Sequence, residues 1–145
     1  NGRFDPNSTC TRGQIVTFLY RAAGSPSGYA NSGYTDVPET SYCAAPVAWA
    51  VALRVTSGTS AITFSPDALC TRAQIVTFLY RMQNSPESKA ENPFTDVKAD
   101  AYYANAVLWA VENGVTTGVS ATTFDPAGDC TRGQIVTFLY RCLSK

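Results

Sequence analysis

The chain contains one stretch three times, first as Thr11-Arg-Gly-Gln-Ile-Val-Thr-Phe-Leu-Tyr-Arg21. The stretch returns at 71–81 and at 131–141, and its copies differ only in their third residue, which is Gly, Ala and Gly in turn. Self-similarity at a fixed interval, here 60 residues, is the mark of a repeat protein. One repeat cannot bury its apolar face alone, so we expect the copies to pack on one another.

The residues around this stretch keep the same register. A Phe-x-Pro loop precedes each copy and begins at Phe4, Phe64 or Phe124, and in the first of these loops we expect the Phe to be buried. A different half-repeat, which opens with Tyr34-Thr-Asp-Val or Phe94-Thr-Asp-Val and continues into an apolar segment with one Trp, occurs only twice. The chain therefore comprises the second half of one repeat and two complete repeats, at 1–26, 27–86 and 87–145.

Each copy of the stretch predicts a helix that begins after a capping threonine. Thr11 and Gln14 form a capping box, in which each side chain accepts a hydrogen bond from the backbone N–H of the other residue. Apolar residues at positions 15, 18, 19 and 22 follow the helical spacing, so one stripe of this helix should face a core. We expect the helix to end near Ala23, with Gly24 as its stop signal.

The segment 101–113 predicts a second helix in the repeat. It is apolar on nearly every side, and a helix of that kind belongs in the middle of an assembly. Its counterpart in the preceding repeat contains Pro46, which must lie in the first helical turn or kink the helix. That counterpart also has Arg54 in place of Gly114. We therefore expect a looser cap there, because a left-handed non-glycine residue costs ~1 kcal/mol.

The composition excludes several classes of function. Eleven Lys and Arg balance eleven Asp and Glu in 145 residues, so no basic excess indicates nucleic-acid binding. The longest apolar run, 42–53, is shorter than the roughly 18 residues of a membrane span. The chain has no histidine, no C-x-x-C pair and no evident pair of catalytic carboxylates, so we expect neither a metal nor a cofactor nor enzyme activity. The five cysteines fit small half-buried thiols, with one disulfide that involves Cys43 as the alternative.

An arginine follows each capping threonine, at Arg12, Arg72 and Arg132. The first turn of a helix has unpaired amides that favour an anion, and a guanidinium there would complete a site for carboxylate or phosphate. The alternative is that each arginine pairs with a nearby Asp or is solvated. The other repeated arginines, Arg21, Arg81 and Arg141, fall on the opposite helix face and fit structural pairing near the helix end. Trp49 and Trp109 fit core aromatics or the wall of a sugar-binding groove.

Taken in order, Phe-Thr-Asp-Val, the Trp-containing apolar segment with Asn-Gly-Val, Thr-Phe-x-Pro and Thr-Arg-x-Gln-Ile-Val resemble the S-layer homology (SLH) domain. The resemblance implies an all-α, pseudo-threefold assembly of helix-loop-helix repeats with short Phe-x-Pro loops. It also implies an extracellular location, because such domains hold surface proteins non-covalently to the cell wall of mainly Gram-positive bacteria. Three features depart from the family pattern: Gln replaces the usual Glu of the capping box, Arg54 replaces a glycine, and the first repeat lacks its first half.

The ligand implied by this resemblance is a secondary cell-wall polysaccharide, often with a ketal-linked pyruvate, bound in grooves between repeats. The implied roles are contact with the acidic group for Arg12, Arg72 and Arg132, and groove walls for the residues Trp49, Trp109, Asp36, Asp96, Gly58 and Gly118. We also expect an upstream segment or another chain to complete the first repeat. The competing hypothesis is a repeat scaffold that binds a protein, such as a host receptor or another surface protein.

Overall fold

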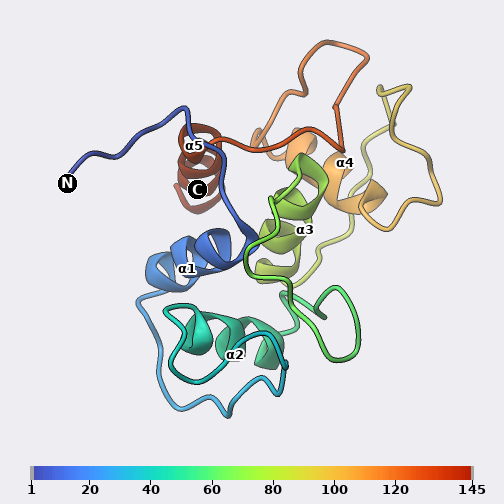
Figure 1. Cartoon of the computed structure of the whole chain (residues 1–145). Helices are drawn as coiled ribbons and strands as arrows, with labels where there is room; N and C mark the ends of the chain where they lie inside the picture. The colour runs from blue at the N-terminus through green and yellow to red at the C-terminus, as the bar shows by residue number, and fades with distance from the viewer. Residues whose placement is uncertain (1, 145) are drawn as a thin grey trace. The chain divides into compact units, whose positions relative to one another are not determined.

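The computed structural model describes residues 2–144, in which all regular structure beyond isolated β-bridges is helical. This confirms the predicted all-α class. Asn1 and Lys145, the outer limits of the first and last predicted repeats, lie outside the described residues. The helices are α1 (Arg12–Ala22), α2 (Ala44–Ala52), α3 (Arg72–Met82), α4 (Ala104–Glu112) and α5 (Arg132–Leu143) (Figure 1).

The chain forms two compact units, and each contains parts of successive repeats. The first extends from Cys10 to Cys70 and packs α1 against α2. The second contains the described chain up to Thr9 and from Thr71 onward, and in it α3 packs against both α4 and α5. Each apolar helix, α2 or α4, therefore packs on the helix that ends the preceding repeat (Figure 1).

The helices α1, α3 and α5, which we call the Thr-Arg helices, begin with the predicted capping boxes. In α1, the Thr11 hydroxyl accepts a hydrogen bond from the Gln14 N–H at 3.3 Å, and the Gln14 side chain accepts one from the Thr11 N–H at 3.1 Å. The same reciprocal pair caps α3 and α5. At the other end, α1 stops where Gly24 adopts a φ of 86°. Both helix signals read from the sequence are confirmed.

The loop that leads to one Thr-Arg helix covers the N-terminus of another. At α1, the backbone N–H groups of Arg12 and Gly13 donate to the carbonyl oxygens of Ala68 and Pro66, both at 2.9 Å. The corresponding donors and acceptors at α3 and α5 are Arg72 to Gly128, Ala73 to Pro126, Arg132 to Ser8 and Gly133 to Pro6. Three successive helix ends thus receive the same pair of loop carbonyls, the last from the start of the chain.

The apolar helices α2 and α4 are largely buried, each within its own compact unit. Each lies against one Thr-Arg helix: Trp49 contacts Tyr20 with ring centroids 5.8 Å apart, and Trp109 contacts Tyr80 at 5.6 Å. The opposite side of α4 carries the exposed residue Asn105. The outer faces are built from alanine and polar residues, so little apolar area needs a second partner. Residues 101–103, expected to be helical, form a turn before α4.

Phe4 differs from its counterparts, and the expectation that it is buried is wrong. Its side chain is 45% exposed, whereas Phe64 and Phe124 are fully buried. The reason is a second aromatic ring: Tyr34 stacks on Phe64 at 6.1 Å, and Phe94 lies 5.7 Å from Phe124. These covering rings come from the half-repeat that occurs only twice in the sequence.

All five cysteines are buried, more deeply than expected. Cys43 is a thiol whose sulfur lies 3.2 Å from the Ser41 hydroxyl, so the alternative of a disulfide at Cys43 is not formed. The cysteines of the repeated position, Cys10, Cys70 and Cys130, have no exposed surface. They are packing residues of the repeat.

The cap after α2 retains the geometry of the cap after α4, so the expected loosening is wrong. Arg54 adopts the left-handed conformation, with a φ of 58°, close to the 64° of Gly114. The Arg54 N–H donates to Val51 at 3.0 Å, and the Gly114 N–H donates to the equivalent carbonyl, that of Val111, at 2.9 Å. Pro46 lies in the first turn of α2, as predicted. The tertiary fold therefore holds a strained residue at position 54.

We predict that Arg54→Gly stabilises the protein by about 1 kcal/mol, because glycine adopts this conformation without a steric penalty. The matched variant Gly114→Ala should lower stability by a similar amount, since a Cβ there meets no atom within 4 Å and only the backbone conformation changes. Urea unfolding measures both. Equal midpoints for Arg54→Gly and the original protein would show that the cap is not strained.

Candidate functional site

Arg72, the first residue of α3, is held by the Phe-x-Pro loop of the following repeat. Its side chain is only 5% exposed, and its Nε–H donates to the carbonyl oxygen of Phe124 at 2.8 Å. The guanidinium carbon lies 4.8 Å from the centre of the Phe124 ring and 5.7 Å from that of Phe138. Such cation–π contacts are stronger when the cation is desolvated, so the two rings fix the guanidinium in place.

One terminal nitrogen of this guanidinium, Nη2 of Arg72, is buried and has no hydrogen-bond partner in the described structure. A buried donor without an acceptor costs about 1–3 kcal/mol, and more when the donor is charged. Among the described residues, no Asp forms an ion pair with Arg72, so the alternative of direct pairing is not observed. An incoming anion or carbonyl oxygen would supply the missing acceptor.

The backbone amides of the first turn of α3 do not form an anion site, so that part of the prediction is wrong. The Arg72 N–H donates to Gly128, the Ala73 N–H to Pro126, and the Gln74 N–H to the Thr71 hydroxyl. Carbonyls from a distant loop and the capping side chain have taken these donors. An acidic ligand at this helix end must therefore be bound by side chains.

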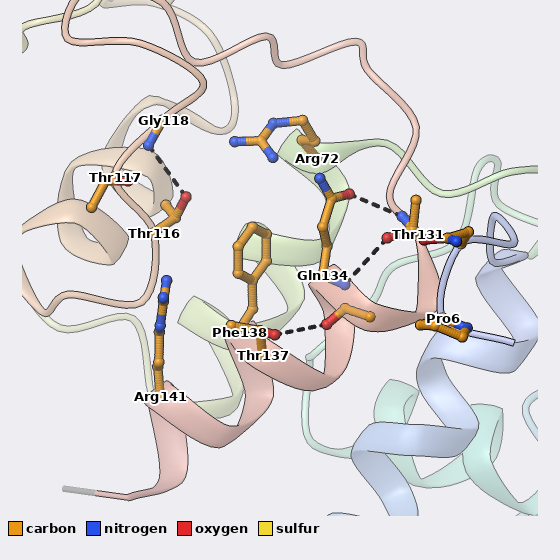
Figure 2. A pocket seen from close by; sticks show the side chains of 12 residues that line it. Pro6, Arg72, Thr116, Thr117, Gly118, Thr131, Gln134, Thr137, Phe138 and Arg141 are labelled. Carbon is orange, nitrogen blue, oxygen red and sulfur yellow. Dashed lines mark hydrogen bonds between the residues drawn. The ribbon is translucent and has the colours of Figure 1, made fainter. Parts of the chain in front are cut away.

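A pocket of about 450 Å³ lies beside Arg72, within one compact unit (Figure 2). Figure 2 shows the guanidinium of Arg72 and the side chain of Arg141 entering it from two different helices, with Phe138 between them. No acidic residue is part of the lining, so the pocket is positively charged. Its lining residues are Pro6, Asn7, Arg72, Thr116, Thr117, Gly118, Thr131, Gly133, Gln134, Thr137, Phe138 and Arg141.

Arg141 was not among the predicted ligand-binding residues. Helical periodicity correctly separates it from the arginine at the start of its own helix, Arg132. The pocket, however, takes its other arginine from α3, and this places Arg141 opposite Arg72. Periodicity within one helix gives no information on which neighbouring helix it will face.

Gly118 is the second predicted residue that the pocket contains. Its φ is 82°, and a Cβ added there would lie 2.7 Å from the Phe94 ring and 2.8 Å from the Thr123 carbonyl oxygen. The Gly118 N–H donates to the Thr116 hydroxyl at 3.3 Å, which fixes the turn that forms the pocket edge (Figure 2). Gly58 has the same conformation in the other unit, where a Cβ would lie 2.6 Å from the Thr63 carbonyl oxygen.

The remaining predicted site residues are not among the lining residues of this pocket. Arg12 and Arg132 repeat the Arg72 geometry, with Nε–H bonds to the carbonyl oxygens of Phe64 at 2.9 Å and Phe4 at 2.7 Å. Arg12 is buried, whereas Arg132 is partly exposed beside the exposed Phe4. Trp49 and Trp109 are core residues, and Trp109 lines a separate cavity of about 370 Å³ with Gln83, Pro86, Asn113, Val115 and Cys142.

Asp36 and Asp96 hold the Phe-x-Pro loops in place through hydrogen bonds to the loop backbone. The Asp96 carboxylate accepts hydrogen bonds from the backbone N–H groups of Phe124 at 2.9 Å and Asp125 at 2.7 Å, and Asp36 does the same for Phe64 and Ser65. Desolvation acts to raise the pKa of the Asp96 carboxyl. These hydrogen bonds and the nearby charge of Arg72 outweigh it and lower the pKa below its ordinary value. The Phe124 peptide is thus bound by Asp96 on one side and Arg72 on the other.

Comparison with known proteins identifies the repeated pattern. The S-layer homology domain description matches residues 33–76 and 93–136. The chain is 41% identical over 78 residues to the surface-layer 125 kDa protein of Lysinibacillus sphaericus. The matched residues cover 52% of this chain and 6% of that protein. It is 31% identical over 135 residues to a cell surface protein of Thermoanaerobacter kivui, which is 89% of this chain and 18% of that protein.

An endoglucanase of Bacillus sp. (strain KSM-635) is 34% identical over 108 residues, which is 74% of this chain and 11% of that enzyme. The chain thus spans less than a fifth of the length of each of these relatives. In the part of the chain that the structure describes, no helix is long and apolar enough to cross a membrane. The same residues contain no group of metal-binding side chains.

We predict that Asp96→Asn lowers the free energy of unfolding by about 1–3 kcal/mol at neutral pH. The reason is that the NH2 group of asparagine replaces one of the two carboxylate oxygens, and this group cannot accept a hydrogen bond. Since the pKa of the folded carboxyl is lowered, its contribution is complete above the ordinary pKa of 3.8 and is lost as the pH falls through the lower folded-state pKa. The stability difference between variant and original should therefore shrink in acid. Urea unfolding as a function of pH measures this, with the exposed Asp100→Asn as control.

Proposed function

Because the chain belongs to the S-layer homology domain family, we propose that it anchors a surface protein to the bacterial cell wall by binding an acidic secondary cell-wall polysaccharide. The family assignment supports a cell-surface location and an anchoring role. The finer proposal concerns the ligand, which is an acidic, pyruvylated glycan, and the site, which is the pocket beside Arg72. The observation that carries it is the buried Nη2 of Arg72, which has no hydrogen-bond partner at the edge of a cationic pocket.

The different surroundings of the nitrogens of the Arg72 guanidinium support this proposal. The Nε–H is committed to the Phe124 carbonyl, so the fold fixes one edge of the planar group. The donor of Nη2 is left for a ligand carboxylate, and a charge-assisted hydrogen bond shielded from water is roughly twice as strong as a neutral one. Arginine suits this task because its donors have a fixed geometry.

The rest of the pocket matches a sugar. Thr117 and Gln134 can exchange hydrogen bonds with ring hydroxyls, while the Phe138 ring, which is only 5% exposed, holds the Arg72 guanidinium rather than stacking on a sugar. Arg141 adds a second positive charge at an exposed position, where salt screens its effect. We therefore expect binding that weakens with ionic strength but persists through the shielded contact to Arg72.

A catalytic role within this chain is not part of the proposal. The endoglucanase relative extends far beyond the matched region, which fits a separate anchor attached to an enzyme. The competing hypothesis, a scaffold that binds a protein, predicts that wall binding survives removal of the polysaccharide. Co-sedimentation with purified cell walls before and after chemical removal of the polysaccharide separates the two hypotheses.

We predict that Arg72→Lys weakens co-sedimentation with intact cell walls at least about tenfold, which corresponds to roughly 1.4 kcal/mol. A lysine keeps the charge but cannot donate to Phe124 and to a ligand with fixed geometry. Arg72→Ala should cost ~2–5 kcal/mol of binding. Arg21→Ala, which removes an exposed arginine in the other unit, is the control and should bind normally.

Thermal melting establishes that each variant is folded before its binding is compared. Normal wall binding by a folded Arg72→Lys protein would contradict the assignment of the ligand site. Undiminished binding of the original protein to stripped walls would contradict the polysaccharide as ligand.

A further inference from the structure

Cys10 and Cys70 lie opposite each other on two extended segments of the first compact unit. Their neighbours Thr11 and Leu69 form an isolated antiparallel β-bridge, and the backbone of Thr11 is extended, with a φ of −81° and a ψ of 161°. At one end of this bridge, the Cys70 N–H donates to the Cys10 carbonyl oxygen at 3.0 Å. The two cysteines are therefore the next opposed pair along the bridge.

The geometry of an antiparallel pair brings the two side chains together. Opposed residues have their Cα atoms about 4.5–5.5 Å apart and their side chains on the same face. A disulfide joins residues whose Cα atoms are about 4.4–6.8 Å apart, so this pair meets the distance requirement. Neither Cys10 nor Cys70 has exposed surface, so both side chains are enclosed in the interior of the same unit.

A bond between these residues would join the two ends of the unit, because the first compact unit begins at Cys10 and ends at Cys70. The closed loop would contain α1, α2 and the loop that covers the start of α1. A disulfide stabilises a fold mainly by restricting the unfolded chain, and the effect grows with the length of the loop. The opposed cysteines thus occupy the positions at which one bond constrains the whole unit.

We propose that Cys10 and Cys70 form a disulfide that closes the first compact unit under the oxidising conditions outside the cell. The structure holds both residues as thiols. The cell-surface location of the family supports oxidation, because disulfides form and persist outside the reducing cytosol. This inference does not depend on the glycan proposal.

The oxidant is a low-molecular-weight disulfide. One cysteine thiolate attacks it and displaces one small thiol, and the second thiolate then attacks the mixed disulfide and displaces the other. The two cysteines together lose two electrons and two protons, and the small disulfide is reduced to two thiols. Because both side chains are buried, the exchange requires that the unit open or that the bond form during folding.

Peptide mapping tests the linkage directly, because each of the five cysteines lies in a different tryptic peptide. The full chain is refolded in a mixture of reduced and oxidised glutathione, its remaining thiols are alkylated, and it is digested without reduction. We expect mass spectrometry to show peptide 4–12 joined to peptide 55–72, and to lose this species after reduction. Cys70→Ala should abolish it. The matched variant Cys130→Ala, at the equivalent position of the last repeat, should retain it.

Urea unfolding measures what the bond does to stability. The oxidised protein should unfold at a midpoint about 1 M or more above that of the reduced protein. Cys70→Ala should have the same midpoint under both conditions, whereas Cys130→Ala should keep the difference. Each variant is compared only with itself, so a loss of packing at the substituted residue does not affect the result.

Complete alkylation of Cys10 and Cys70 in the folded protein from the glutathione mixture would overturn the proposal. Linkage of either residue to Cys43 or Cys130, or a mixed disulfide with glutathione, would overturn it too. Equal urea midpoints for the linked and the reduced protein would contradict the closure of the unit. No readout here contains glycan, so the outcome of the cell-wall experiments leaves these results unchanged.

Discussion

The fold depends on one buried interaction, in which an arginine at a helix N-terminus donates a hydrogen bond to the backbone of a distant loop. Arg72 donates to the Phe124 carbonyl and lies over its ring, and Asp96 accepts from the N–H of the same residue. Charge-assisted bonds of this kind connect a loop to a helix more than 50 residues away in sequence. The arginine bond occurs in all three copies, and the aspartate bonds occur in two. In the function proposed above, the residue that joins successive repeats also binds the acidic ligand.

Local chemistry in the sequence was sufficient to predict the Thr-Arg helices, their capping boxes and the place of Pro46, because each depends on residues within one or two turns. The predictions that were wrong failed because of contacts between segments that are distant in the sequence. The amides of the first turn looked available for an anion, yet carbonyls of another loop accept from them. The cap at Arg54 was expected to loosen, yet it has the hydrogen bonds of its glycine counterpart. Neither result is encoded near the residue concerned.

The site was predictable only in part, for the same reason. Arg72 and Gly118 stand out in the sequence through their repeat positions, and the pocket contains both. Arg141 and Thr117 carry no local signal, since their place in the pocket lining follows from which helices and turns meet. The tryptophans illustrate the opposite case: their chemistry fits a sugar site, but the packing of α4 on α3 takes the Trp109 ring into the core.

The central claim is that the fold uses Nε of Arg72 and leaves Nη2 for the ligand. Nuclear magnetic resonance of the chain with isotope-labelled arginine tests it directly, during titration with a monosaccharide that carries a ketal-linked pyruvate. The account predicts that the terminal N–H signals of Arg72 shift on titration and become protected from exchange, while its Nε–H signal remains protected throughout. Saturable binding that leaves the terminal N–H signals of Arg72 unchanged would contradict it.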